Sequence, residues 1–166
     1  MELRLWIANF KALHQRARKG ELSGEERKQY LSLREELAKA MCSAQRLQTL
    51  PGQTQRQSMR VARALQIDLE LPEGRQRLMT MNISVGGFAA LLPKEPSKSA
   101  GLIGFSLRLP GSTEPLIGRV RVVDVQKRPG NAMVSFAFNE LGAAEQERLE
   151  LALFDVVLQQ FEGTQF

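Results

Sequence analysis

The 166-residue chain has very little of what catalytic and metal-binding sites are usually built from. It contains one cysteine, Cys42, and one histidine, His14. A single cysteine excludes an internal disulfide and a cysteine-based zinc cluster, and it is typical of a protein from a reducing cytoplasm. A single histidine excludes every catalytic or metal scheme that needs two. Because the chain also shows no paired carboxylates, phosphate-binding loop or nucleophile motif, we expect neither an enzyme nor a metal or cofactor site.

Long apolar runs are missing as well. No stretch approaches the ~18 uncharged apolar residues of a membrane-spanning helix, and Glu2 and Arg4 interrupt the apolar start that a signal peptide would need. Aromatic residues make up only 6%, so a core must be built mainly from Leu, Val, Ile, Ala and Met. The hydrophobic content of 43% excludes disorder of the whole chain. The composition therefore predicts a folded protein with no membrane span.

Positive charge is concentrated in the first third of the chain. The net charge is +5, and residues 1–50 carry ten basic and six acidic side chains, whereas the remainder is nearly neutral. A basic excess favours an anionic partner, and a nucleic-acid-binding protein that uses these residues is one interpretation. Nucleic-acid-binding domains usually show a denser basic patch with aromatic side chains interleaved. The sequence has no such patch, so this interpretation ranks last.

Residues 1–48 have the pattern of two amphipathic helices. Apolar side chains recur at i, i+3, i+4 and i+7, which predicts a first helix over residues 2–19. Ser23 and Glu26 have the spacing of a capping box, in which each side chain satisfies a backbone amide at a helix start. The second helix then continues to about Leu47. A short turn between two such helices predicts an antiparallel helical hairpin.

A helical hairpin has two narrow apolar stripes and no third layer to cover them. Trp6 and Phe10 lie on the first stripe, and a soluble protein seldom leaves such large residues exposed together. The stripes must pack on the rest of the chain, on a second copy of the chain or on another protein. We expect a protein partner or a homodimer that forms through these helices.

A polar linker, residues 49–60, separates the hairpin from the rest of the chain, and Pro51-Gly52 is its turn signal. From residue 61 onward the apolar period falls to two, which is typical of half-buried strands. The predicted strands are residues 65–71, 76–83, 88–92, 102–109, 116–125 and 132–138, and a helix over 143–161 follows. Six short strands with turns between them indicate an antiparallel barrel or sandwich over residues 61–166, covered by one helix. The fold class is therefore α+β with a mainly β second part.

The first candidate motif is Arg56-Gln-Ser-Met-Arg60, at the end of the polar linker. Its two arginines lie four residues apart, just before the first strand. Guanidinium groups are planar and carry a fork of donors, so they stack on purines, bond the O6 and N7 edge of guanine and pair with phosphate. If the linker folds over the barrel, both groups can reach one ligand.

The second candidate motif is Asn82-Ile-Ser84-Val-Gly-Gly87, where the second predicted strand turns into the third. Asn82 offers an acceptor and a donor in one plane, which suits the edge of a base, and Ser84 lies two residues on, on the same strand face. Gly87 permits positive φ and a close approach of the backbone to a ligand. Taken alone, the motif is more typical of a glycine-containing turn closed by a side-chain hydrogen bond.

Together the two motifs, with 21 residues between them, resemble the PilZ domain family. The resemblance covers roughly residues 54–161, about two thirds of the chain. It implies a six-stranded antiparallel β-barrel with a C-terminal helix. It also implies a bacterial cytoplasmic receptor for the second messenger cyclic di-GMP (c-di-GMP).

By this resemblance, Arg56 and Arg60 hold guanine edges and phosphates of c-di-GMP. Asn82 and Ser84 contact a guanine from the barrel surface, and Gly87 keeps the turn open for it. Asn82 stands where many family members have Asp. A neutral amide brings one acceptor and a donor that must find its own partner, so somewhat weaker binding is expected.

The expected function is a signal-transducing adaptor. Binding of c-di-GMP would close the linker over the barrel and change the placement of the N-terminal helices, which would signal to a protein partner. The main alternative is a protein-interaction module with the PilZ fold that does not bind the nucleotide. The intact arginine pair and the intact Asn-x-Ser-x-x-Gly motif argue against this alternative.

Overall fold

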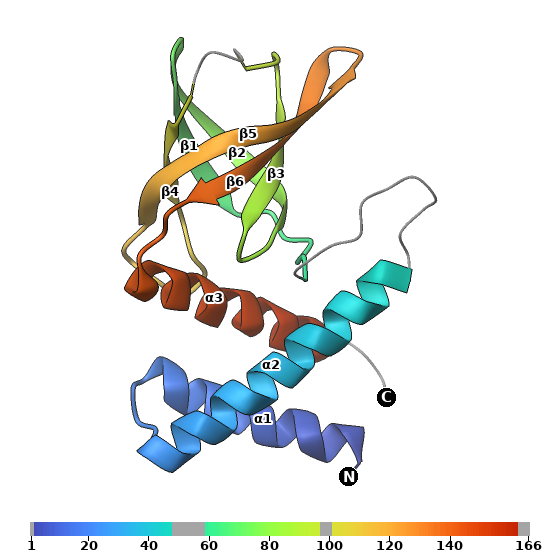
Figure 1. The fold of residues 1–166 in the computed structure, drawn as a ribbon, viewed down its shortest axis with the longest axis vertical. Helices are drawn as coiled ribbons and strands as arrows, with labels where there is room; N and C mark the ends of the chain where they lie inside the picture. Colours follow the sequence, from blue (N-terminus) through green and yellow to red (C-terminus); the bar gives the residue numbers. More distant parts are fainter. Residues whose placement is uncertain (1, 48–58, 97–100, 163–166) are drawn as a thin grey trace. The chain divides into compact units, whose positions relative to one another are not determined.

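The computed structural model describes residues 2–47, 59–96 and 101–162, which form two compact units. The helical unit contains α1 (Leu3–Arg18), α2 (Gly24–Leu47) and the C-terminal part of α3 (Ala143–Glu162). The barrel unit, residues 60–153, contains six strands and the first part of α3. The strands are β1 (Gln66–Leu71), β2 (Gly74–Ile83), β3 (Gly87–Leu92), β4 (Ile103–Leu107), β5 (Leu116–Arg128) and β6 (Asn131–Asn139), shown in Figure 1.

The six strands close into an antiparallel barrel in the order β1-β2-β3-β6-β5-β4. Each predicted strand and helix is present, with bounds that differ by a few residues; β5, for example, continues to Arg128 instead of ending at Val125. Closure gives every strand a neighbour on each side, although β5 beyond Val120 pairs with β6 alone. The predicted fold is confirmed: an N-terminal helical hairpin, a six-stranded antiparallel barrel and a C-terminal helix.

The barrel interior is filled by aliphatic side chains and phenylalanines. Inward and outward positions alternate along the strands except at the bulges in β2 and β5. Ile67, Leu107 and Val134 are among the completely buried inward residues. Phe88 and Phe136 stack with ring centroids 4.9 Å apart. Burial of each such side chain stabilises the fold by about 1.5–3 kcal/mol relative to exposure. The period-two pattern of the sequence is therefore what encodes the barrel core.

The first part of α3 completes the barrel unit. Leu149 and Leu153, one helical turn apart, are both buried. Arg148 donates hydrogen bonds to Ser112 Oγ at 3.2 Å and to the Glu114 carbonyl oxygen at 2.6 Å. These bonds hold α3 to the turn that connects β4 and β5.

The core of the helical unit gathers around Phe10, which is fully buried. Its ring stacks on Tyr30 of α2 with centroids 5.6 Å apart and meets Phe154 of α3 edge-on at 6.1 Å. The guanidinium of Arg34 lies 5.2 Å from the Tyr30 ring centroid and 5.8 Å from that of Phe154. Such aromatic and cation–π contacts contribute about 0.5–2 kcal/mol each beyond burial. Side chains from three helices therefore build this core.

A buried histidine joins the same core. His14 Nδ1 lies 2.8 Å from the Tyr30 hydroxyl, and His14 Nε2 lies 3.7 Å from Asp155 Oδ1. Asp155 also accepts a hydrogen bond from Arg18 at 2.8 Å. Burial lowers the pKa of His14 to about 4, and the nearby Asp155 carboxylate opposes this only in part. His14 is therefore neutral at pH 7 and acts as a packing residue.

The C-terminal part of α3 packs with the hairpin. Phe154 contacts the Phe10 ring of α1 and the Arg34 guanidinium of α2, and Asp155 pairs with Arg18 of α1. The sequence-based division placed residues 143–161 entirely with the barrel, because nothing in the pattern separates the two ends of this helix. The chain's own α3 thus covers part of the apolar stripe of α1, while Leu5 of the same helix stays 62% exposed.

The predicted capping box at the start of α2 is confirmed. The Ser23 N–H donates to Glu26 Oε1 at 3.2 Å, and the Glu26 N–H donates to Ser23 Oγ at 3.3 Å. Arg16 of α1 forms an ion pair with Glu26. Hydrogen bonding from Arg16 is the main reason that the pKa of Glu26 is lowered to about 2. The cap therefore also ties the end of α1 to the start of α2.

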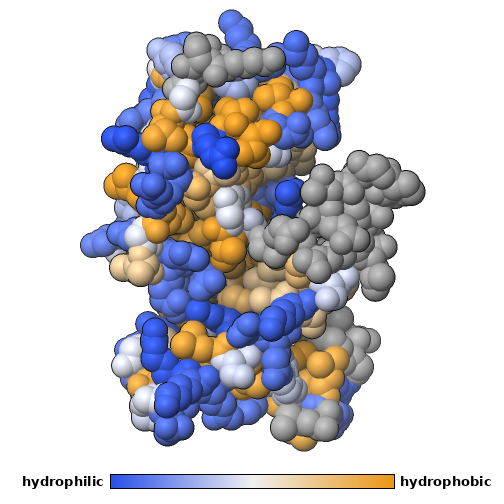
Figure 2. Space-filling model, viewed as in Figure 1, coloured by the Kyte–Doolittle hydropathy of each residue, from blue (hydrophilic) through white to orange (hydrophobic). Residues whose placement is uncertain are grey.

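Apolar side chains also reach the surface of the barrel unit. Met79, Met81, Ile117 and Val123 are among the large apolar residues that stay exposed. In the view of Figure 2, hydrophilic side chains interrupt the apolar surface of the barrel. No helix within the described ranges has the length and apolarity that a membrane crossing requires.

Candidate functional site

The second motif forms the turn between β2 and β3. The Ser84 N–H donates to the Gly87 carbonyl oxygen at 2.8 Å, and the Gly86 carbonyl accepts from the Phe138 N–H of β6 at 2.9 Å. The Ser84 hydroxyl accepts from the Gly86 N–H at 3.2 Å and reaches the Gly87 carbonyl at 3.4 Å. A hydroxyl has one donor and two acceptor positions. Ser84 therefore uses its donor and one acceptor position within the turn, and its side chain is buried.

A β-bulge turns Asn82 toward the outside of the barrel. Thr80 and Asn82 pair with consecutive residues of β3, so Met81 is an extra residue in β2. Thr80 and Ile83 are both buried, although strict alternation would place residues three apart on opposite faces. The bulge allows both to face inward and leaves Asn82 half-buried on the outer face. A ligand on the barrel surface can therefore reach its amide.

Gly87 is required by the packing of β3 against β6. The positive φ expected from the sequence is absent at this residue. A Cβ here would lie 1.9 Å from the Phe136 carbonyl oxygen and 3.0 Å from Ala137 Cα. Only glycine lets the two backbones approach this closely. Its observed role is to seat the Ser84 turn against β6.

The end of the polar linker is tied to β2 beside this turn. Val61 and Ile83 exchange two backbone hydrogen bonds, of 2.8 and 2.9 Å. The buried Thr80 hydroxyl donates to the Arg63 carbonyl at 2.7 Å and accepts from the Leu65 N–H at 2.9 Å. Thr80 is a positioning residue that the sequence analysis missed, since one threonine in a strand is no signal by itself. Its bonds fix the chain that follows the first motif.

This pairing brings Arg60 to the second motif. Val61 lies opposite the last residue of β2, so the antiparallel register places Arg60 opposite Ser84. Val61 is buried and Arg60 is exposed, and Arg60 therefore lies on the outer side of the barrel, as Asn82 does. Arg56 lies outside the described residues. The structure thus brings Arg60 and Asn82 together on one outer surface, with the buried Ser84 beside them.

The chemistry of this surface suits a planar, anionic ligand. Arg60 offers a planar cation, Asn82 offers both an amide donor and an acceptor, and Ser84 offers one acceptor. Within the described part of the chain, no three side chains of the metal-ligating types lie close enough to hold a metal ion. The arrangement can recognise and hold a ligand.

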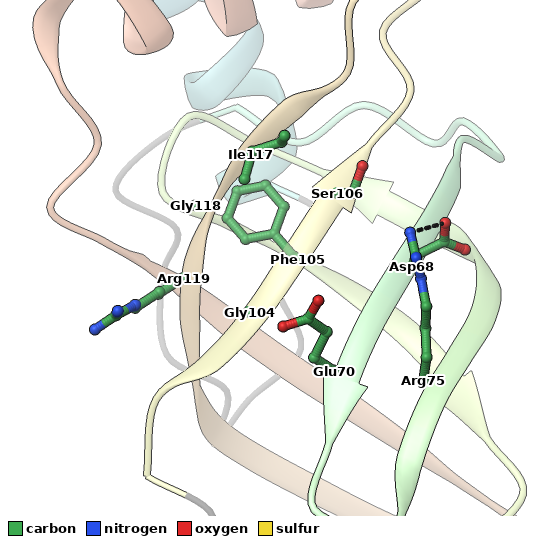
Figure 3. A pocket seen from close by; sticks show the side chains of 9 residues that line it. All are labelled: Asp68, Glu70, Arg75, Gly104, Phe105, Ser106, Ile117, Gly118 and Arg119. Carbon is green, nitrogen blue, oxygen red and sulfur yellow. Dashed lines mark hydrogen bonds and ion pairs between the residues drawn. The ribbon is translucent and has the colours of Figure 1, made fainter.

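A separate hollow of about 330 Å³ lies outside β1, β4 and β5, and none of the predicted site residues lines it. Figure 3 shows the Glu70 carboxylate over Gly104, with Asp68 bonded to Arg75. Arg75 and Arg77 lie 3.1 and 3.0 Å from the Asp68 carboxylate, and hydrogen bonding from Arg77 is the largest cause of its lowered pKa. The charge of Asp68 is therefore already compensated within the barrel.

The chain is thus a closed six-stranded barrel that follows an arginine-bearing linker and carries Asn-x-Ser-x-x-Gly at the β2–β3 turn. The family model for the PilZ domain matches residues 54–155. The chain therefore belongs to the PilZ domain family. A comparison with curated protein sequences gives no significant match.

Solved structures of several bacterial proteins share this fold. The inhibitor of motility MotI/DgrA from Bacillus subtilis is 22% identical with a TM-score of 0.54, over 68% of this chain and 55% of that one. YcgR from Escherichia coli in complex with c-di-GMP is 17% identical with a TM-score of 0.53, over 66% and 49%. The MrkH–c-di-GMP complex from K. pneumonia is 20% identical with a TM-score of 0.55, over 68% and 56%. The match spans about half the length of each of these proteins, and at such identities it shows the fold.

Proposed function

We propose that this chain is a non-catalytic cytoplasmic receptor for c-di-GMP. The observation that carries the proposal is the backbone pairing of Val61 with Ile83, which sets Arg60 beside Asn82 and Ser84. Both motifs of a nucleotide-binding PilZ domain are present in the sequence, and two similar folds were solved as c-di-GMP complexes. Arg56 completes the proposed site from the linker.

Each side chain of the proposed site has a role that follows from its chemistry. Arg56 and Arg60 pair with the phosphates and guanine edges of the ligand, because a guanidinium combines charge with a planar fork of donors. The Asn82 amide oxygen accepts from guanine N1–H and N2–H, and Ser84 adds an acceptor. Gly87 acts indirectly, since it seats the turn that carries Ser84.

The helical unit is the proposed output element. Two chain segments join it to the barrel unit: the polar linker that carries the arginine pair, and α3, whose two parts belong to different units. A ligand held by Arg60 and the β2–β3 turn would contact the end of the polar linker, which is one of these two connections. We propose that binding thereby changes the placement of the N-terminal helices, which contact a protein partner or a second copy of the chain.

Two observations favour the alternative of an interaction module that does not bind the nucleotide. The Ser84 hydroxyl uses its donor and one acceptor position within its own turn, and Asn82 lacks the charge of the aspartate found in many relatives. Both features weaken the contacts from β2. In this alternative the arginine pair would still contact a protein partner, but titration with c-di-GMP would produce no heat.

Isothermal titration calorimetry of the full chain with c-di-GMP tests the proposal. Arg60→Ala should weaken binding at least tenfold, because a charge-assisted contact contributes about 1.5–3 kcal/mol. Arg63→Ala is the matched control: it is also exposed and follows the same motif, and its affinity should stay within twofold of wild type. Arg60→Lys should not restore binding, since an ammonium lacks the planar fork. Wild-type affinity in Arg60→Ala would show that the site is wrongly assigned.

A further inference from the structure

Strand β5 carries two arginines on the outer face of the barrel, and these two arginines have different neighbouring residues. Arg119 and Arg121 are both exposed, while Val120 between them is fully buried. Arg119 pairs with Gly104 of β4 and lies beside the hollow, where Figure 3 shows its side chain extending away from the other labelled residues. Arg121 lies beyond the β4 pairing, which ends at the partner of Val120. The two arginines are therefore chemically alike but differently placed.

Arg121 lies in the same cross-strand row as the second motif. It pairs with Ala137 of β6, and Ala137 pairs with Gly87 of β3. Neighbouring strands lie about 4.8 Å apart, so the backbones of Arg121 and Gly87 are about 10 Å apart across the barrel surface. Only the Ala137 methyl group stands between them in this row. A long, exposed arginine side chain can lie over it toward the motif.

The charges on this face decide what Arg121 would contact. The cross-strand row next to that of Arg121 begins at Asn82 of β2. It continues through Ala89 of β3 and Ser135 of β6 and ends at Asp124 of β5. Its carboxylate would repel a phosphate placed beside it. The O6 and N7 atoms of guanine are uncharged acceptors, and they suit an arginine next to a carboxylate better than a phosphate does.

On this basis, and resting on the proposed function, we propose that Arg121 is a third arginine of the nucleotide site. The guanine held by Asn82 and Ser84 through its N1–H and N2–H edge lies over Ala137. Its O6 and N7 edge then faces β5, where Arg121 donates two hydrogen bonds to it. Asn82 and Arg121 would thus hold two different edges of one base, which makes Arg121 a determinant of specificity for guanine.

Calorimetry of the full chain with c-di-GMP tests this role by comparing Arg121→Ala with Arg119→Ala. Arg121→Ala should weaken binding at least tenfold, and Arg119→Ala should change it less than twofold. Equal affinities of the two variants, with Arg60→Ala still impaired, would overturn the assignment of Arg121 and leave the proposed function intact. If wild-type protein shows no binding, the proposed function fails and the role of Arg121 fails with it.

A modified ligand tests which group Arg121 contacts. The 7-deaza analogue of c-di-GMP replaces N7 by carbon and so removes one of the two proposed acceptors. It should bind wild-type protein several-fold more weakly than c-di-GMP, whereas Arg121→Ala should bind the two ligands about equally. The same ratio in both proteins would overturn the base-edge contact and point to a phosphate contact instead.

Discussion

The barrel unit and the helical unit hold their cores together in different ways. In the barrel, every strand is hydrogen-bonded to a neighbour on each side, and the interior is largely aliphatic and phenylalanine. In the helical unit, three helices meet around Phe10, and two of the buried side chains there, His14 and Arg34, are polar. The first core depends on pairing that repeats along the chain, and the second depends on a few large side chains.

This difference indicates where each unit is fragile. A closed ladder spreads its stability over many residues, so the barrel should be sensitive where a buried side chain is removed or where two backbones come unusually close, as at Gly87. A cluster of rings concentrates stability in single residues that touch several others. The polar members of that cluster add a dependence on pH near neutrality, through His14.

The largest effect is expected from Phe10→Ala. Removal of a fully buried phenylalanine costs about 3–5 kcal/mol, and this ring contacts residues of all three helices. Trp6, the only tryptophan of the chain, stacks on Phe10 with centroids 5.7 Å apart, so its fluorescence reports unfolding of the helical unit. Leu5→Ala, on the same helix but exposed, is the control. Equal stability of the two variants would contradict the central role of Phe10.

Gly87→Ala tests the close approach in the barrel. The added methyl group would lie 1.9 Å from the Phe136 carbonyl oxygen, so the backbone must shift, at a cost of about 1–3 kcal/mol. Gly86→Ala is the matched control, because its methyl group would meet nothing nearer than Ser84 Oγ at 3.8 Å. Hydrogen exchange of the strand amides should accelerate in Gly87→Ala only. Similar exchange in both variants would refute the steric explanation.

A further effect, of similar size to that of Gly87→Ala, should come from pH, through His14. Its pKa is about 4 in the folded chain and near 6.5 when unfolded, so the unfolded state binds more protons below pH 6.5. Stability is therefore full above that pH and falls as pH drops toward 4. Between pH 7 and pH 5 the loss should be about 2 kcal/mol. Urea unfolding at both values should show this loss in wild type and not in His14→Gln; an identical loss in both proteins would contradict it.

Much of the architecture could be predicted because the spacing of apolar residues along the sequence differs between strands and helices. The alternation that begins near Ile67 and the helical spacing around Phe10 each reflect a repeat within a few residues. The capping box at Ser23 and Glu26 is equally local, and the structure contains it. The closed order of the strands came from the family resemblance rather than from any pattern.

The remaining features depend on contacts between residues that are distant in the sequence. The contact of Phe10 with Phe154 joins residues 144 positions apart, and no spacing reveals it. The reason for glycine at position 87 lies in β6, and the placement of Arg121 depends on which strands flank β5. Alternation shows only that Arg121 faces outward. The bulge at Met81, which sets the direction of Asn82, likewise appears only once β2 is paired with β3.

The division of α3 between two units affects how such a barrel can be transferred between proteins during evolution. Most transferable modules begin and end in exposed loops, but here the boundary after Leu153 lies within a helix. A gene rearrangement that kept the barrel and α3 but discarded the hairpin would leave Phe154 without the Phe10 ring and the Arg34 guanidinium that contact it. The recipient protein would have to supply a new apolar surface at that point. Selection should therefore keep the hairpin and the end of α3 together, as one inherited unit.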